Sequence, residues 1–295
     1  MIEEVKLHPK VWERHKMKNY LNLVFVALAA MGGYLAAIKN IDQTTSVGFE
    51  ETLKTATFVE LSHTLSSDLP DGPGPSPTIE VLRSHEPDIG IFPQGGSIHR
   101  YSFPGQWGTH IDAPIHFVGG KRTTENIPLS EMILPLIVFD IHEQVLENPD
   151  YQITLHDVAA WEEINGLVPE KTFVALRTDW SKKWPDINTI RNWDADHVSH
   201  TPGWSKEVLD YLVNIRNITA IGHETLDTDI GMLSAALLYP LETYYLGLDK
   251  YQIESMKSLD QLPPIGAYIV ATWALAKDGA GFPARVFAII PENVK

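Results

Sequence analysis

The sequence predicts a layered α/β domain, with a mixed β-sheet and flanking helices. Short segments rich in β-branched and aromatic residues, bounded by Gly, Pro or Asp, recur along the chain and are typical of strands. They outnumber the segments with the helical repeat of apolar residues, and the two kinds occur in mixed order. The chain has 295 residues, 44% of them hydrophobic, which is enough to bury one large core or two small ones.

The individual elements follow from these patterns in chain order. The Pro- and Gly-rich segment 69–77 is expected to form a loop. Apolar residues recur near every third or fourth place in three segments, so helices are expected at about 155–164, 205–216 and 232–246. The strand pattern predicts strands at 57–63, 97–103, 134–142, 172–179, 267–273 and 284–290.

The N-terminal part of the chain differs in composition from the rest. Residues 1–18 carry five lysines and arginines, and residues 20–38 carry no charge. A basic flank before an apolar run is typical of a secretory signal peptide, and the run is nearly long enough to span a bilayer as an anchor. Three glutamates in the flank favour a third interpretation, a helix packed on the domain or on a partner subunit.

We therefore divide the chain into 1–50, which is a signal peptide, anchor or packed helix, and one larger domain, 51–295. Export to the periplasm or anchoring with membrane contact through residues 20–38 is favoured over a cytoplasmic location.

Composition excludes several classes of function. The formal net charge of −15 argues against nucleic acid as a partner. The chain has no cysteine, so a metal here must be held by nitrogen and oxygen donors. The sequence contains no G-x-G-x-x-G, P-loop or G-x-S-x-G motif, and nucleotide-binding and serine-hydrolase functions therefore lack their usual support.

The segment 106–117, QWGTHIDAPIHF, gathers metal-binding side chains. His110 and Asp112 are two residues apart, so both project to one face of an extended chain, and Gln106 lies on that same face. An imidazole, a carboxylate and an amide oxygen that converge in this way form a candidate site for a divalent metal. His116 continues the alternation after a proline bend and can reach the site as a proton carrier.

GTHIDAPIHF resembles the signature H-x-G-T-H-x-D-x-P-x-H of the cyclase superfamily of metal-dependent hydrolases, which includes bacterial kynurenine formamidases and isatin hydrolases. The resemblance extends over most of residues 56–290 and leaves 1–55 outside. It implies the family's swivelling β/β/α type of fold. By the same analogy we expect a homodimer or homotetramer.

The resemblance also assigns the site residues. In the family, the positions of Gln106, His110 and Asp112 bind one metal, and the position of His116 is a catalytic acid/base. A second metal uses the same aspartate with two residues twelve apart, which are Glu242 and Glu254 here. Gln106 and Glu242 stand where the family has histidine. The resulting harder donor set favours ions such as Mn²⁺, and Zn²⁺ is also accepted; one or two ions are expected.

The activity that the resemblance implies is hydrolysis of a formamide or lactam bond by a metal-activated water, as in an arylformamidase. The substrate is then a small amide or cyclic amide such as N-formylkynurenine or isatin, and Trp107 and His223 are expected to contact it. Two alternatives stay open: a lactonase or other cyclic-substrate hydrolase, and an exported metal- or ligand-binding protein without turnover. Gln106 and Glu242 keep the last alternative open, whereas His116 argues against it, because binding alone needs no proton carrier.

Overall fold

The computed structural model describes residues 48–67, 76–85, 95–236 and 238–294. The chain forms two compact units, 1–54 and 55–295. In the first, the structure describes residues 48–54, which include all but the last residue of α2 (Phe49–Thr55), so the predicted signal peptide or anchor lies outside the described residues. Most of the predicted loop 69–77 lies outside them as well. None of the helices that the structure describes is both long and apolar enough to cross a membrane.

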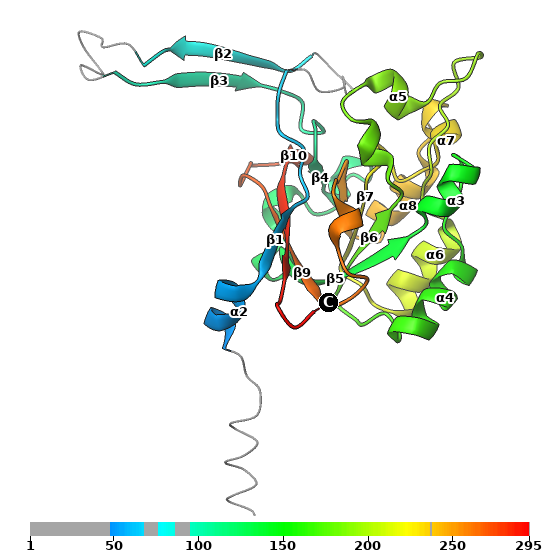
Figure 1. Cartoon of the computed structure of the whole chain (residues 1–295). Helices are drawn as coiled ribbons and strands as arrows, with labels where there is room; N and C mark the ends of the chain where they lie inside the picture. Colours follow the sequence, from blue (N-terminus) through cyan, green and yellow to red (C-terminus); the bar gives the residue numbers. More distant parts are fainter. Residues whose placement is uncertain (1–47, 68–75, 86–94, 237, 295) are drawn as a thin grey trace, which may run out of the picture. The chain divides into compact units, whose positions relative to one another are not determined.

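The second unit is built on a mixed sheet in which nine described strands take part (Figure 1). Four neighbouring strands, β5, β6, β7 and β8, run parallel, and the remaining pairs are antiparallel. The order across the sheet is β1 (Thr57–Glu60), β11 (Arg285–Ile290), β9 (Ala267–Thr272), β5 (Ile133–Asp140), β6 (Phe173–Arg177), β7 (Ala220–His223), β8 (Tyr251–Glu254), β4 (His110–Asp112) and β10 (Gly281–Pro283).

A separate two-stranded sheet pairs β2 (Thr78–Arg83) with β3 (Ile98–Ser102). Most of its side chains are exposed, including the apolar Val81 and Tyr101.

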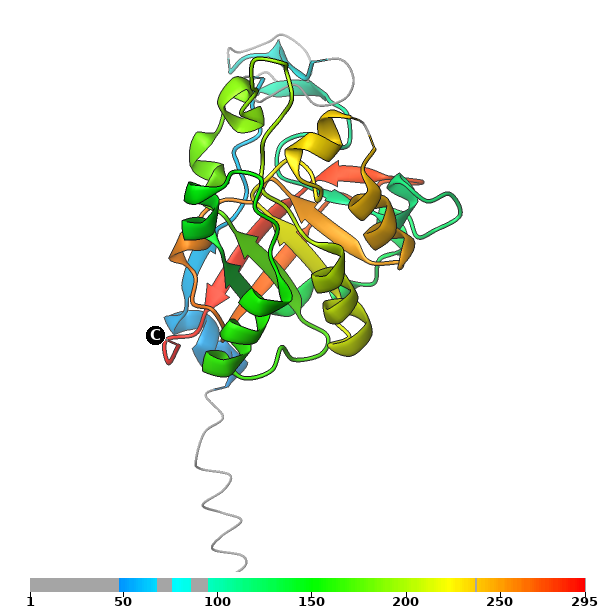
Figure 2. The same ribbon diagram turned by 90° about the vertical axis from the view of Figure 1, so that its right-hand side faces the viewer.

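The central strands are buried on both faces. In β6, Phe173 and Ala175 belong to one core, and Val174 and Leu176 belong to the other. Such a continuous apolar run is typical of a parallel strand covered on both sides. The first core joins strands from both ends of the sheet, so the sheet curls around it. Helices cover the second core (Figure 2), namely α4 (Leu155–Asn165), α6 (Lys206–Asp210) and α8 (Pro240–Gly247).

The mixed sheet with flanking helices confirms the predicted fold class. Helix α4 matches the helix expected at 155–164. The helix expected at 205–216 is α6 followed by a π-helical turn at Tyr211–Ile215. The remaining described helices are α3 (His142–Glu147), α5 (Ile187–Arg191) and α7 (Gly231–Ala235).

The single helix expected at 232–246 is wrong. The chain forms α7, breaks, and begins α8 at Pro240. Tyr239 has a positive φ of 42°, outside the right-handed helical region. The proline explains the break, because it lacks an N–H and disfavours helical geometry in the residue before it. Each of the six expected strands overlaps an observed strand, but β2, β4, β7, β8 and β10 were not predicted as strands.

Candidate metal centre

The pairing of β4 with β8 gathers four polar side chains on one face of the sheet. His110 pairs with Glu254, and Asp112 pairs with Gln252. Paired and alternate residues point to the same face, so these four side chains lie together. All four residues are at most 4% exposed. Water therefore does not satisfy their polar groups, and they must interact with one another or with a bound ligand.

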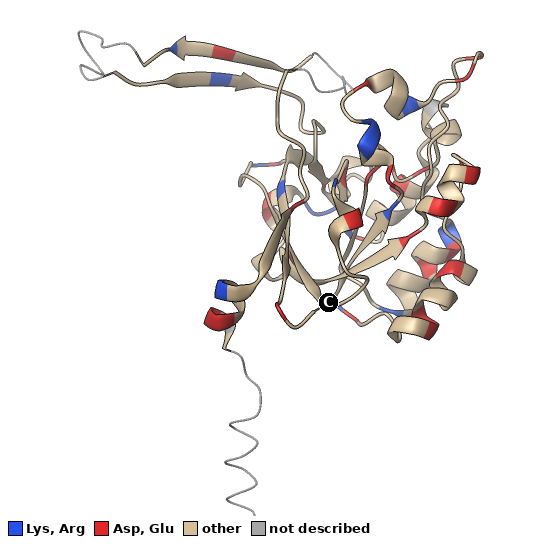
Figure 3. Ribbon diagram, in the orientation of Figure 1, with Lys and Arg blue, Asp and Glu red and all other residues tan. Residues whose placement is uncertain are grey.

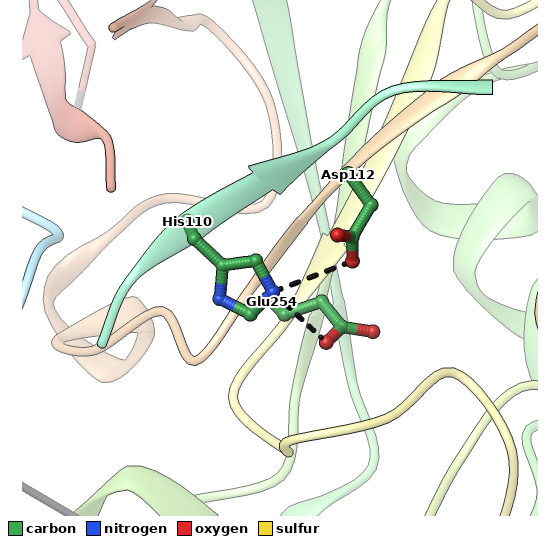
Figure 4. Close-up of side chains that lie close together, drawn as sticks. All are labelled: His110, Asp112 and Glu254. Carbon is green, nitrogen blue, oxygen red and sulfur yellow. Dashed lines mark ion pairs between the residues drawn. The ribbon is translucent and has the colours of Figure 1, made fainter. Parts of the chain in front are cut away.

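His110 is oriented so that one ring nitrogen faces two carboxylates. Its Nε2 lies 3.4 Å from Asp112 Oδ2 and 3.4 Å from Glu254 Oε2 (Figure 4). Its Nδ1 lies 2.9 Å from the carbonyl oxygen of Gly108, which can only accept a hydrogen bond. Nδ1 therefore carries the proton in the neutral ring and Nε2 has a free lone pair, as a metal ligand requires. Gly108 has a φ of 64°, a conformation that favours glycine and turns its carbonyl toward the ring.

Helix α8 brings a third carboxylate. Glu242 lies in its first turn and is 3% exposed. The Asp229 carboxylate accepts the backbone N–H groups of Leu241 at 2.9 Å and of Glu242 at 3.0 Å, which fixes the start of the helix. Asp112 consequently belongs to two groups of metal-binding atoms, each group within 4.8 Å: one with His110 and Glu254, the other with His116 and Glu242.

Gln106 and His116 lie beside Asp112 at the second group. Gln106 Nε2 lies 3.3 Å from Asp112 Oδ1 and 3.5 Å from His116 Nδ1. His116 Nε2 lies 3.8 Å from the same Asp112 oxygen. The His116 side chain is 25% exposed, against 5% or less for His110, Asp112 and Glu254. His116 is thus the histidine of the cluster that is open to an incoming molecule.

Gln252 lies at the centre of the cluster and was missed in the sequence. Its amide nitrogen is 3.3 Å from Asp112 Oδ2, 3.1 Å from Glu242 Oε1 and 2.9 Å from Glu254 Oε1. The Thr228 hydroxyl donates to Gln252 Oε1 at 2.6 Å, which fixes the orientation of the amide. The signal that could have revealed it is its spacing, two residues before Glu254 in a strand.

The electrostatics of the cluster require a cation. Burial, followed by the charges of Glu254 and Asp112, raises the pKa of Glu242 well above its ordinary value. Burial alone would raise the pKa of Asp112, but His110 outweighs it and lowers that pKa to about 2. Burial lowers the pKa of His110, yet the two carboxylates beside it raise that pKa well above the ordinary value.

In the absence of another cation, protons on His110 and Glu242 therefore offset the repulsion between the carboxylates. Within the described ranges, no lysine or arginine forms an ion pair with Asp112, Glu242 or Glu254. Lysine and arginine positions are scattered over the described elements (Figure 3). A ligand set of buried carboxylates and an imidazole with a free lone pair suits a divalent metal ion, which would displace the protons.

The two residues expected to contact substrate are both buried. Trp107 is 1% exposed, and its indole nitrogen has no hydrogen-bond partner among the residues that the structure describes. His223 is also 1% exposed; its Nδ1 accepts a hydrogen bond from Trp204 Nε1 at 3.2 Å, and its Nε2 lies 3.4 Å from Glu254 Oε1. The structure therefore places His223 against the cluster, and substrate contact by either residue stays a prediction.

Comparisons with known proteins agree with the sequence motif. The Cyclase family model matches residues 59–230. Isatin hydrolase from Roseibium aggregatum is 29% identical over 191 residues, which cover 63% of this chain and 72% of that protein. Isatin hydrolase A from Labrenzia aggregata, solved with benzyl benzoate, is 31% identical with a TM-score of 0.72, covering 80% of this chain and 94% of that one. Isatin hydrolase A from Ralstonia solanacearum is 30% identical with a TM-score of 0.72, covering 89% and 97%. The chain belongs to the cyclase family.

Proposed function

We propose that this protein is a metal-dependent hydrolase that opens the C–N bond of a small cyclic amide of the isatin type. The observation that carries the proposal is the buried group of His110, Asp112 and Glu254, whose carboxylates have no lysine or arginine partner among the described residues. The relatives reported above are isatin hydrolases, which favours a lactam over the formamide that the sequence also allows.

His110, Asp112 and Glu254 would hold one cation, and Glu242 with Asp112 would hold a second. When bound, a divalent cation supplies Lewis acidity, which polarises a carbonyl group and makes water a stronger acid. The preponderance of oxygen donors favours Mn²⁺, and Zn²⁺ is the alternative.

His116 moves the proton in this proposal. The oxygen of a water molecule bonds to the amide carbonyl carbon, and the C–N bond breaks. His116 takes one proton from the water and delivers it to the leaving nitrogen, and the second water proton is released to solvent, so that the ring opens to a carboxylate and an amine. Its side chain fits this role because it is partly exposed while it borders Asp112 and the Gln106 amide.

An aromatic substrate agrees with the residues next to His116. The ring of Phe117 meets His116 edge-on, with ring centres 4.7 Å apart. The ring centre of Tyr239 lies 5.5 Å from that of Phe117. Aromatic side chains favour a planar aromatic ligand through stacking and edge contacts.

The test is hydrolysis of isatin by the purified full chain loaded with Mn²⁺ or Zn²⁺, with formanilide and a panel of lactones as comparison substrates. Ring opening of isatin that a chelator abolishes and added metal restores supports the proposal. Faster turnover of formanilide or a lactone would replace the lactam with that substrate class. Metal binding without turnover on any of them would contradict the proposed reaction.

A further inference from the structure

Two buried histidines lie on either side of the Glu254 carboxylate. His110 Nε2 is 3.4 Å from Glu254 Oε2, and His223 Nε2 is 3.4 Å from Glu254 Oε1. Both imidazoles are at most 4% exposed, so their protonation is set by their hydrogen-bond partners and not by water.

Those partners give the two rings opposite tautomers. The Nδ1 of His110 faces a carbonyl oxygen, which can only accept a hydrogen bond, so in the neutral ring Nδ1 is protonated and Nε2 is not. The Nδ1 of His223 faces the indole nitrogen of Trp204, which is a donor only. Neutral His223 therefore carries its proton on Nε2, which lies 3.4 Å from Glu254 Oε1 and makes no hydrogen bond to a described residue.

Trp204 is itself held in place. It is fully buried, its backbone N–H donates to the carbonyl oxygen of Thr228 at 3.0 Å, and its own carbonyl oxygen accepts from Gln152 Nε2 at 2.9 Å. The hydroxyl of the same Thr228 orients Gln252, which donates to Glu254 Oε1 at 2.9 Å. Two donors, His223 and Gln252, thus approach one oxygen of Glu254, and Thr228 is linked to both.

We propose that Trp204 and His223 are a positioning pair for the metal ligand Glu254. The indole N–H fixes the tautomer of His223. The resulting Nε2–H lies beside Glu254 Oε1 at 3.4 Å, where its positive end attracts that oxygen, and Gln252 donates to the same oxygen. Glu254 Oε2 is then left to the cation together with His110 Nε2. His223 is therefore a positioning residue, neither a metal ligand nor a proton carrier. This inference rests on the metal site of the proposed function, and it matches the general use of outer hydrogen bonds to orient ligands.

The first experiment reads the tautomer directly. Nitrogen-15 NMR of the full chain with labelled histidine, loaded with diamagnetic Zn²⁺, should show His223 protonated on Nε2 and unprotonated on Nδ1. In Trp204→Phe, which keeps an aromatic ring and removes the donor, this preference for one tautomer should weaken. A His223 protonated on Nδ1, or bound to Zn²⁺ through Nε2, overturns the inference.

The second experiment measures Zn²⁺ affinity of the full chain by competition with a chelator. His223→Leu should weaken binding on the order of tenfold to a hundredfold, and His223→Gln, which keeps a donor toward Glu254, should recover most of the loss. Trp204→Phe should weaken binding in the wild-type background and have no further effect in His223→Leu, because the two residues act through one hydrogen bond.

Trp180→Phe is the matched control. Trp180 is also buried, and its indole donates to the Ile190 carbonyl oxygen at 2.8 Å, away from Glu254. Its loss should leave Zn²⁺ affinity unchanged. Additive effects of the Trp204 and His223 substitutions, or unchanged affinity in His223→Leu, would refute the positioning role. Both readouts are independent of turnover, so absence of isatin hydrolysis refutes the proposed reaction and leaves this inference standing. A chain that binds no Zn²⁺ at all refutes both.

Discussion

Asp229 accepts the backbone N–H of Glu242 at 3.0 Å, so the loop that follows β7 determines where the third carboxylate of the metal centre lies. The same carboxylate accepts the N–H of Leu241, which makes it the cap of α8 although it is distant in sequence. Helix stability and metal affinity are therefore linked through one side chain.

Asp229→Ala should lower both the stability of the protein and its affinity for metal. Loss of a helix cap costs about 1–2 kcal/mol of the free energy of unfolding. The start of α8 would also lose its fixed position, which should weaken metal binding. Denaturant unfolding and chelator competition measure the two effects, and Asp229→Asn, which keeps an acceptor oxygen, should be milder in both. A variant with normal stability and normal metal affinity would contradict the link.

Glu242→Gln should stabilise the metal-free protein at neutral and alkaline pH. Burial raises the pKa of Glu242 in the folded state above its ordinary value of 4.5, so between these values the folded state binds more protons than the unfolded state. The Glu242 contribution to stability is therefore present below pH 4.5 and is lost as pH rises toward the raised pKa. A glutamine side chain is neutral without binding a proton, so Glu242→Gln removes this loss of stability at high pH.

Denaturant unfolding in the presence of a chelator at pH 5 and pH 8 is the measurement. The difference between Glu242→Gln and wild type should grow toward pH 8 and should shrink or reverse when Mn²⁺ is added to wild type. A difference that does not change with pH would contradict the protonated state of Glu242.

Gly281→Ala should disturb the Gln106 amide. A Cβ at this position would lie 2.2 Å from Gln106 Nε2 and 2.8 Å from the backbone oxygen of Ile111 in β4. We expect weaker metal binding and slower turnover. Gly247→Ala is the control, because its Cβ would meet only Val118, at an ordinary 3.7 Å. Equal metal affinity in the two variants would show that the Gln106 amide does not depend on the absence of a Cβ at Gly281.

His116→Ala should separate chemistry from metal binding. Loss of a general acid–base group costs about a hundredfold to ten-thousandfold in kcat. His110, Asp112 and Glu254 are untouched, so the metal content should stay at the wild-type level. Steady-state kinetics on isatin and elemental analysis of the same sample provide the test. Unchanged kcat would remove His116 from the mechanism.

The β4 half of the metal centre could be predicted from the sequence, because its donors are close together and alternate along one extended segment. The contacts of Gln252 and Asp229 could not, because they depend on strand pairing and helix capping between distant segments. Strand β8 was missed for a different reason. Tyr251 and Ile253 alternate with Gln252 and Glu254, but the alternation covers only four residues, which is the lower limit for recognising a strand.

The fold was predictable where burial on both faces leaves a continuous apolar run, as in β5 and β6. The prediction of a single helix at 232–246 was wrong, because it gave more weight to the helical repeat of apolar residues than to Pro240, which ends one helix and begins the next. The tautomer of His223 could not be predicted, because it depends on the indole of Trp204, nineteen residues away in sequence.

The metal content of the full chain tests the central claim most directly. The chain should be purified after expression with ample Mn²⁺ and Zn²⁺ and analysed beside Asp112→Ala. The account predicts at least one tightly bound divalent cation per chain in wild type and its loss in Asp112→Ala, since Asp112 belongs to both donor groups. Wild-type protein without a bound cation, or equal metal content in the two proteins, would contradict it.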